Sequence, residues 1–345
     1  MRQSFPRAQA KVPLPRPDPA NSYTVGWICA RYEEYMCACR MLDEKLPAPH
    51  LVRGDLDNNT YVFGRIAGHY VVITCLPAGR HGGTTAAHTA RDMIRTFPKL
   101  QFALSVGIAG GAPTADNDIR LGDVVVGVPN GDLPAVIEWD HGARLQDGRF
   151  VRTGQLDAPP QKLLQVIPDI QRRYADMRQP DGIAENLKRL RDMKQYRRPA
   201  CDDKLYDAHY AHVGGPDCGR CHDSFTVQRA PRKDQRVVQV HYGTIGSGNA
   251  DVQDPRMRDS YANEPQMKFL CFDMTSAGLM NSIPCLPIRG ISNYCDSHAN
   301  DKWNHYAALT AASYARELLL VLPAEQRVDP TLPQYGEVVR GRWHG

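Results

Sequence analysis

CFDMTSAG, at residues 271–278, and IRGISNYCD, at residues 288–296, are the two stretches that decide the fold class of this chain. The first begins as a short apolar strand and leads directly into a helix, and the second is a strand that ends in polar residues. Other apolar runs have the length and composition of buried strands, and they lie at 23–30, 60–66, 69–77, 102–106, 118–129, 237–247 and 268–273. Helical patterns separate most of these runs. Buried strands that alternate with helices predict an α/β fold with a parallel or mixed sheet.

The helical patterns and the breaks between them predict the domain organisation. Helices are expected at 33–45, 84–96, 162–176 and 301–320, and the last should bury one face. Ala67-Gly68 joins two of the strands as a hairpin turn. The regular pattern degrades between about 159 and 236. We therefore expect one domain at 22–322 with an insertion at about 177–236, an arm at 1–21 and a polar tail at 323–345.

Composition argues against several classes of protein. The formal net charge is only +4 over 345 residues and no run of five basic residues occurs, so no nucleic-acid partner is expected. No apolar run approaches the roughly 20 residues that span a bilayer, so no membrane partner is expected either. The proline-rich residues 1–20 lack the apolar segment of a secretory signal. Ten cysteines without such a signal are expected to be reduced thiols, which indicates a cytoplasmic location.

Two glycine-rich segments are candidates for ligand contact. GIAGG, at residues 107–111, follows a predicted strand, and its glycines would let the backbone approach a ligand, although a tight turn explains the same pattern. GRHGGTT, at residues 79–85, leads into a predicted helix. Arg80 and His81 would suit an anion at the start of that helix. A plain turn with an N-cap from Thr84 or Thr85 is the alternative.

The segment CGRCH, at residues 218–222, raises the question of a metal. It matches a haem-attachment motif, which requires an exported protein and is not expected here. Zinc is the other option, and the candidate ligands are Cys201, Cys218, Cys221 and either His222 or His212. Structural zinc usually takes two close pairs of ligands, and only one such pair is present. An unliganded loop is therefore the favoured interpretation, and we assign no metal and no cofactor.

The order of motifs along the chain resembles the purine/uridine phosphorylase superfamily. These motifs are YTVGWICA at 23–30 followed by Glu33-Glu34, LPAG at 76–79, GIAGG at 107–111, DIRLGDVV at 118–125, HYG at 241–243, SGN at 247–249 and the two stretches quoted first. Within the superfamily, the chain resembles nucleosidase-like domains common in fungal proteins and is similar to methylthioadenosine/S-adenosylhomocysteine nucleosidases. The resemblance covers roughly residues 22–322.

The resemblance implies a three-layer α/β/α sandwich around a central mixed sheet and cleavage of a nucleoside N-glycosidic bond. Glu34 falls where the nucleosidases have the glutamate that activates water. Ser105 and Ile108 stand where the hexameric phosphorylases bind phosphate, and neither is a cation. Hydrolysis is therefore expected rather than phosphorolysis. A small-molecule substrate and a homo-oligomeric assembly are also implied.

Two positions depart from the pattern of the family. Its ribose-binding Met-Glu pair reads Met274-Thr275 here, and a threonine is short and neutral. Its catalytic aspartate falls at Asn293, which donates a hydrogen bond but does not deliver a proton. Asp273 would replace the missing glutamate only in part, and Arg31 adds a cation beside the pocket. An asparagine also serves the leaving base in trimeric purine nucleoside phosphorylases, so Asn293 is compatible with 6-oxopurine substrates.

Two functions stay open from the sequence. One is a purine nucleosidase with Glu34 and Asn293 as catalytic residues. The other is a repurposed scaffold that binds or converts a non-nucleoside small molecule, for example as a cyclase or isomerase in secondary metabolism. In both cases the resemblance implies that the ligand contacts Arg31, Ile108, Ala109, Gly110, Asn249, Val252, Phe272, Asp273, Met274 and Thr275.

Overall fold

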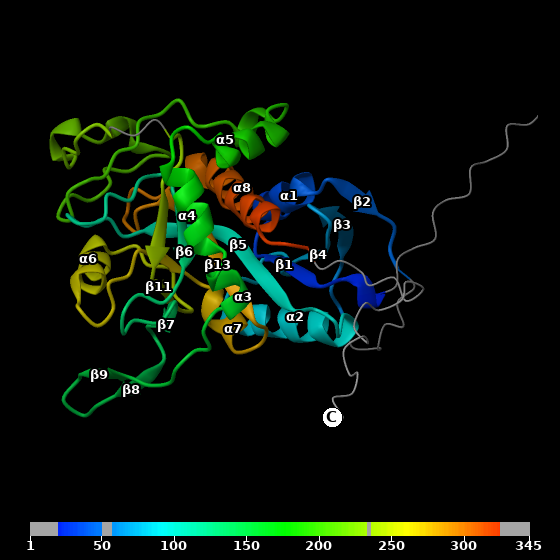
Figure 1. The fold of residues 1–345 in the computed structure, drawn as a ribbon. Helices are drawn as coiled ribbons and strands as arrows, with labels where there is room; N and C mark the ends of the chain where they lie inside the picture. Colours follow the sequence, from blue (N-terminus) through cyan, green and yellow to red (C-terminus); the bar gives the residue numbers. More distant parts are fainter. Residues whose placement is uncertain (1–19, 50–56, 233–235, 325–345) are drawn as a thin grey trace, which may run out of the picture.

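The computed structural model describes residues 20–49, 57–232 and 236–324 (Figure 1). The predicted arm at 1–21 and the predicted tail at 323–345 lie almost entirely outside these residues. Among the described residues, no helix combines the length and the apolar character that crossing a bilayer requires.

Eleven strands of the described residues form one mixed sheet through the middle of the molecule (Figure 1). The main path of the sheet is β10-β6-β13-β5-β1-β4-β3-β2, and β12, β11 and β7 extend it from the carboxyl end of β5. β5 is parallel to β1 and β13 but antiparallel to β12. The strands are β1 (Val25–Cys29), β2 (Glu44–Leu46), β3 (Val62–Ile66), β4 (His69–Cys75), β5 (Phe102–Gly111), β6 (Val124–Gly127), β7 (Val136–Glu138), β10 (Val240–Gly243), β11 (Ile245–Ser247), β12 (Cys271–Asp273) and β13 (Cys285–Asn293), with β8 (Gly142–Arg144) and β9 (Phe150–Arg152) as a separate hairpin.

Helices cover both faces of the sheet. One face carries α1 (Tyr32–Met41), α4 (Ile167–Ala175), α5 (Gly182–Leu187) and α8 (Asn304–Val321), and the other carries α2 (Gly83–Thr96) and α7 (Ser276–Met280) (Figure 1). Trp27 packs in the cluster beneath α1 and α8, whereas the next residue, Ile28, packs in the cluster with α2 and α7. Because successive strand side chains point to opposite faces, this alternation places an apolar core on each side of the sheet. The remaining helices are α3 (Gln161–Leu164) and α6 (Pro255–Asn263), and short 3-10 turns lie at Ala20–Ser22, Lys188–Leu190, Lys194–Tyr196, Cys218–Arg220, Asp223–Phe225 and Asp301–Trp303.

Three predicted helices differ from the structure. The helix expected at 33–45 ends at Met41, because the chain turns there into the edge strand β2. The helix expected at 162–176 is divided into α3 and α4, and Pro168 lies in the first turn of α4, where a missing N–H is tolerated. α8 is buried around most of its circumference rather than on one face, because α1, α4 and α5 also pack against it.

The GIAGG segment is strand rather than turn. β5 continues through Gly111, since Gly107 to Gly110 pair with β13 and Gly110 and Gly111 pair with β12. The tight-turn interpretation of this segment is therefore wrong. Glycine is needed at positions 107 and 110 because side chains from other parts of the chain lie where a Cβ would be.

The described residues of the segment 177–236 carry little regular structure apart from α5 and four of the 3-10 turns. Ion pairs hold the segment against the sheet. Arg229 bonds to Asp203 within the segment and to the hydroxyl of Tyr294, and Arg232 bonds to the carboxylate of Asp123.

Candidate functional site

A cavity lies where the carboxyl ends of β1, β5 and β13 meet the beginnings of α1 and α7. Ligands of open α/β sheets bind in this position, outside the carboxyl ends of the strands. Most of the predicted site residues line the cavity, and these are Arg31, Glu34, His81, Ile108, Ala109, Gly110, Phe272, Asp273, Met274, Thr275 and Asn293.

Glu34 is the buried carboxylate of this cavity, with only 3% of the residue exposed. Its Oε2 accepts hydrogen bonds from the N–H groups of Ala30, at 2.7 Å, and Arg31, at 3.0 Å, and its Oε1 accepts one from Ile108 N–H at 2.9 Å. Burial raises the pKa of Glu34, and the three N–H groups together with Arg289 offset that rise only in part. A fixed carboxylate with a raised pKa is a stronger base than an ordinary glutamate, which suits it to accept a proton from water.

Gly107 makes room for this carboxylate. A Cβ at position 107 would lie 2.7 Å from Oε1 of Glu34, and side chains do not tolerate that distance. The glycine therefore allows a helix-borne acid to press against the middle of β5. This is the physical reason for the first glycine of GIAGG.

Arg289 is the cation beneath the cavity, and the sequence interpretation missed it. Its guanidinium donates to Asp273 Oδ2 at 2.6 Å, to Ser105 O at 2.6 Å and to Ser105 Oγ at 2.8 Å, and it also reaches Thr275 Oγ1 at 3.0 Å. The side chains of Arg289 and Asp273 are each 2% exposed. An arginine in the middle of an apolar strand requires a buried partner. The pattern IRGIS contained that signal.

Asp273 is committed to this network. Besides Arg289, it accepts a hydrogen bond from Ser276 Oγ at 2.6 Å. Burial alone would raise the pKa of Asp273, but Arg289 and hydrogen bonds from Ser247 and Ser276 hold it below the usual range. Asp273 is thus an ionised partner of Arg289, which limits its capacity to replace the missing ribose-binding glutamate.

Asn293 is held in one orientation at the end of β13. Its Oδ1 accepts from Cys295 N–H at 2.9 Å, which leaves its Nδ2 as the group that donates, 3.3 Å from Ser292 Oγ. A Cβ on Gly110 would lie 2.7 Å from Oδ1 of Asn293 and 2.2 Å from the sulfur of Cys295. Gly110 therefore admits this turn, just as Gly107 admits Glu34.

Two basic residues, Arg31 and His81, line the cavity. Arg31 precedes α1 and His81 precedes α2, and no hydrogen bond or ion pair holds either side chain among the described residues.

The N-cap from Thr84 or Thr85 that the sequence offered as an alternative does not occur. α2 begins at Gly83 with Gly82 as its N-cap, and Thr84 and Thr85 lie inside the helix.

The structure does not bring three predicted residues to the cavity. Val252 is buried and packs with Trp139 and Phe272, Asn249 is exposed, and Arg80 is not part of the lining. Asp251, which lies between Asn249 and Val252, contributes to the lining instead.

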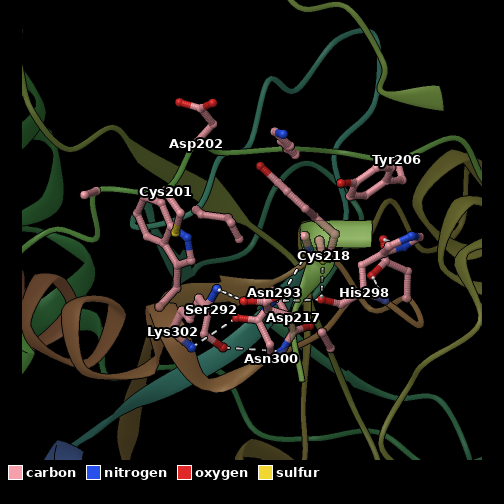
Figure 2. Close-up of a pocket in the computed structure, with 18 residues that line it drawn as sticks. Cys201, Asp202, Tyr206, Asp217, Cys218, Ser292, Asn293, His298, Asn300 and Lys302 are labelled. Carbon is pink, nitrogen blue, oxygen red and sulfur yellow. Dashed lines mark hydrogen bonds and ion pairs between the residues drawn. The ribbon is translucent and has the colours of Figure 1, made fainter. Parts of the chain in front are cut away.

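A second cavity, drawn in Figure 2, shares two lining residues with the first. Ser292 and Asn293 line both cavities, and residues of the segment 177–236 such as Cys201, Tyr206 and Cys218 complete the second. Its remaining wall comes from residues that follow β13, among them His298 and Lys302. The end of β13 therefore separates two spaces.

The candidate metal ligands divide into two groups. His212, Cys218 and Cys221 offer ligand atoms that all lie within 4.8 Å of one another. Cys201 and His222 do not belong to this cluster. All ten cysteines are free thiols.

Comparison with known sequences gives a longer relative. No protein-family model matches the chain. A nucleotide-binding leucine-rich repeat (NLR)-like protein of Hyaloscypha variabilis is 39% identical over 302 residues, which are 88% of this chain. The chain spans only 30% of the length of that relative.

Comparison with solved structures gives nucleosidases. The 5′-methylthioadenosine/S-adenosylhomocysteine nucleosidase of Helicobacter pylori superposes with a TM-score of 0.54 at 14% identity, over 87% of this chain and 98% of that one. The Neisseria meningitidis enzyme, solved with methylthio-immucillin-A, gives 0.52 at 17% identity, over 87% and 99%. Futalosine hydrolase of Helicobacter pylori gives 0.51 at 14% identity, over 86% and 97%. The predicted fold class is confirmed, since this is the three-layer α/β sandwich of the nucleoside phosphorylase fold.

Proposed function

We propose that the chain hydrolyses the N-glycosidic bond of a nucleoside, with Glu34 as the general base. The observation that carries this proposal is the buried Glu34 carboxylate in the cavity at the strand ends, fixed by three backbone N–H groups and raised in pKa. The fold shared with nucleosidases and futalosine hydrolase supports the same reaction class.

The charges around Glu34 favour water over phosphate as the nucleophile. Arg289 is the cation beneath the site, and its charge is balanced by Asp273 at 2.6 Å. The carboxylate of Glu34 would repel a phosphate but would orient a water molecule. Arg31 and His81 also line the cavity, and we propose that they contact an anionic substituent of the substrate.

The reaction can be written with these groups. Glu34 takes a proton from water as the oxygen attacks the anomeric carbon, and the C–N bond breaks with its electron pair on the base. The carboxylate of Glu34 favours the positive charge that develops on the oxocarbenium-like sugar, whereas the charge of Asp273 is balanced by Arg289. Asn293 donates from Nδ2 to the departing base, which takes its proton from solvent. Without a general acid, we expect a rate lower by about 10²–10⁴-fold than an enzyme with an aspartate there.

Release of free base, measured by chromatography, tests this proposal. Adenosine, inosine, guanosine, methylthioadenosine and ATP should each be incubated with and without phosphate. We expect release without phosphate that is lost in Glu34→Gln. Glu33→Gln is the matched control, because Glu33 is the preceding residue of α1 and does not line the cavity. Release that survives in Glu34→Gln, or that requires phosphate, contradicts the assignment.

A second candidate is a scaffold that binds a small molecule without glycosidic cleavage. Thr275 and Asn293 together favour it, because both replace acids of the family and both lie in the cavity. Restoration separates the two functions. If cleavage is only weakened, Thr275→Glu with Asn293→Asp should raise base release sharply, whereas a reshaped pocket should leave the double variant inactive.

Assembly and location remain proposals of their own. The resemblance supports a homo-oligomer, the ten cysteines support a cytoplasmic location, and the small net charge argues against a nucleic-acid partner. Sedimentation velocity of the purified chain tests the assembly, and a single species at the mass of one chain would contradict it.

A further inference from the structure

A cluster of metal-ligating side chains lies outside the cavity that contains Glu34. One ring nitrogen of His212 and the sulfurs of Cys218 and Cys221 lie within 4.8 Å of one another. These residues come from the irregular segment 177–236, where the turn at Cys218–Arg220 brings the two sulfurs to the same side. Two thiols and an imidazole at such distances are the ligand types that zinc prefers.

His298 stands beside this cluster as an unsatisfied group. It is 7% exposed, and neither ring nitrogen has a hydrogen-bond partner among the described residues. Nδ1 is 3.7 Å from Asp296 Oδ2, which is beyond hydrogen-bond length. The ring lies 5.5 Å from the ring of His212, and the main-chain oxygen lies 3.8 Å from the sulfur of Cys218. A buried imidazole without a partner is costly unless a ligand satisfies it.

We propose that His212, Cys218 and Cys221 bind a structural Zn²⁺ ion. The ring nitrogens of His298 lie outside the 4.8 Å cluster, so we propose that this unsatisfied ring turns toward the ion to supply the fourth ligand. Two sulfurs and two imidazole nitrogens give the closed tetrahedral set of a structural site. The two thiols bind as thiolates and release their protons to solvent.

Backbone contacts hold the imidazole ring of His212 in one orientation and one tautomer. His212 Nε2 lies 3.0 Å from Asp217 O, and because a carbonyl only accepts, this contact places the proton on Nε2. The lone pair is then on Nδ1, which lies 3.0 Å from Gly214 N–H. A metal ligand whose other ring nitrogen donates to a carbonyl is the usual arrangement. Binding of the ion would replace only the contact with Gly214.

The ion would join the segment 177–236 to the loop that follows β13. Cys218 and His298 line the second cavity together with Asn293 (Figure 2). Two further contacts cross the same boundary, from His212 N–H to Ser297 Oγ at 3.0 Å and from Lys302 to Asp217 at 2.9 Å. A zinc ion here would therefore fix the wall of the second cavity beside Asn293, independently of any reaction in the first.

Metal content of the purified chain tests the proposal. The full chain, expressed with added zinc, kept reduced and dialysed without chelator, should contain one zinc ion per chain by mass spectrometry. Cys218→Ser, Cys221→Ser and His212→Ala should each lose most of it. Cys201→Ser and His222→Ala are the matched controls, because these residues are a cysteine and a histidine of the same segment that lie outside the cluster. Both variants should keep the ion.

Cobalt binding gives a second test that uses the wild-type chain and does not depend on whether the ligand variants fold. Co²⁺ added to the metal-free, reduced wild-type chain should give a thiolate-to-cobalt charge-transfer band, which Cys201→Ser keeps. Absence of zinc and of this band in a folded wild-type chain, or a disulfide between Cys218 and Cys221, would overturn the proposal. Equal zinc affinity in His298→Ala and the wild type would overturn the four-ligand assignment.

Discussion

Single residues in this molecule are explained by what approaches them from elsewhere in the chain. Gly107 and Gly110 look like a flexible turn in the sequence, yet both belong to β5. Each is required because a carboxylate or an amide lies where a Cβ would be. The local sequence pattern thus identified residues 107–111 as a special segment, but only the fold explains why glycines stand there.

Replacement of Gly107 by alanine should damage the site more than the fold. The new Cβ would lie 2.7 Å from Oε1 of Glu34, so the carboxylate must move. A displacement of about 1 Å at a catalytic group costs about 100-fold in rate, and we expect a loss of base release of that order. Gly83→Ala is the control, because its Cβ would meet only ordinary contacts of 3.5 Å or more. Unchanged kcat/KM in Gly107→Ala would contradict the role of Glu34.

The raised pKa of Glu34 sets the pH dependence of the reaction. A general base must be ionised, so kcat/KM should rise with pH through a pKa above the ordinary value of about 4.3. The folded chain also holds the Glu34 proton more tightly than the unfolded chain. The contribution of Glu34 to stability therefore decreases as pH rises from the unfolded to the folded pKa. A pH–rate profile checks the first statement, and an acidic limb centred at or below about 4.3 would refute it.

At the scale of elements, β13 joins the core to the site. Its apolar residues pack on both faces of the sheet, its Arg289 holds the β12–α7 junction through Asp273, and its end carries Asn293. The two stretches that decided the fold class in the sequence, 271–278 and 288–296, thus each contribute one residue, Asp273 and Arg289, to a buried ion pair.

Loss of one partner of this pair should be more harmful than loss of both. Arg289→Met leaves Asp273 charged and buried, which costs about 3–5 kcal/mol of stability. Asp273→Asn should likewise destabilise the chain, and the double variant should lose less than the sum of the single losses. Urea denaturation followed by circular dichroism measures the three midpoints. Additive losses would show that the two side chains do not act as a pair.

The sequence predicted the buried apolar strands well but missed the short strands β2 and β7, for a physical reason. The apolar run at 23–30 marks β1 by itself, and the stretch at 288–296 marks the second half of β13. β2 and β7 have three residues each and exist because a neighbouring strand supplies their hydrogen bonds. The same dependence on distant partners concealed the role of Arg289, whose guanidinium bonds to Asp273 and Ser105. Family resemblance supplied Glu34 and Asn293, whose roles no local pattern reveals.

At the scale of the whole molecule, the first part of the segment 177–236 packs in the apolar core through Ile183, Leu190 and Tyr196, and its later part is attached to the sandwich by polar contacts. Asp123 is the centre of one attachment, with its side chain 3% exposed, and it accepts from Arg232 Nη1 at 2.7 Å and lies 3.0 Å from His241 Nε2. Burial alone would raise the pKa of Asp123, but hydrogen bonds with Arg232 and His241 hold it below the usual range. Its contribution to stability is therefore present above the unfolded pKa of about 3.9 and is lost as pH falls through the folded pKa.

Removal of Arg232 should loosen this segment before it unfolds the sandwich. Arg232→Ala leaves a buried carboxylate with fewer partners, which costs about 1–3 kcal/mol near neutral pH. The deficit should shrink as acid protonates Asp123. Limited proteolysis should then cut within 177–236 faster than in the wild type. Arg178→Ala is the control, since Arg178 is 89% exposed and pairs only with the nearby Asp176. Equal cleavage rates for both variants would mean that other contacts, such as Arg229 with Asp203 or the proposed zinc site, suffice to hold the segment.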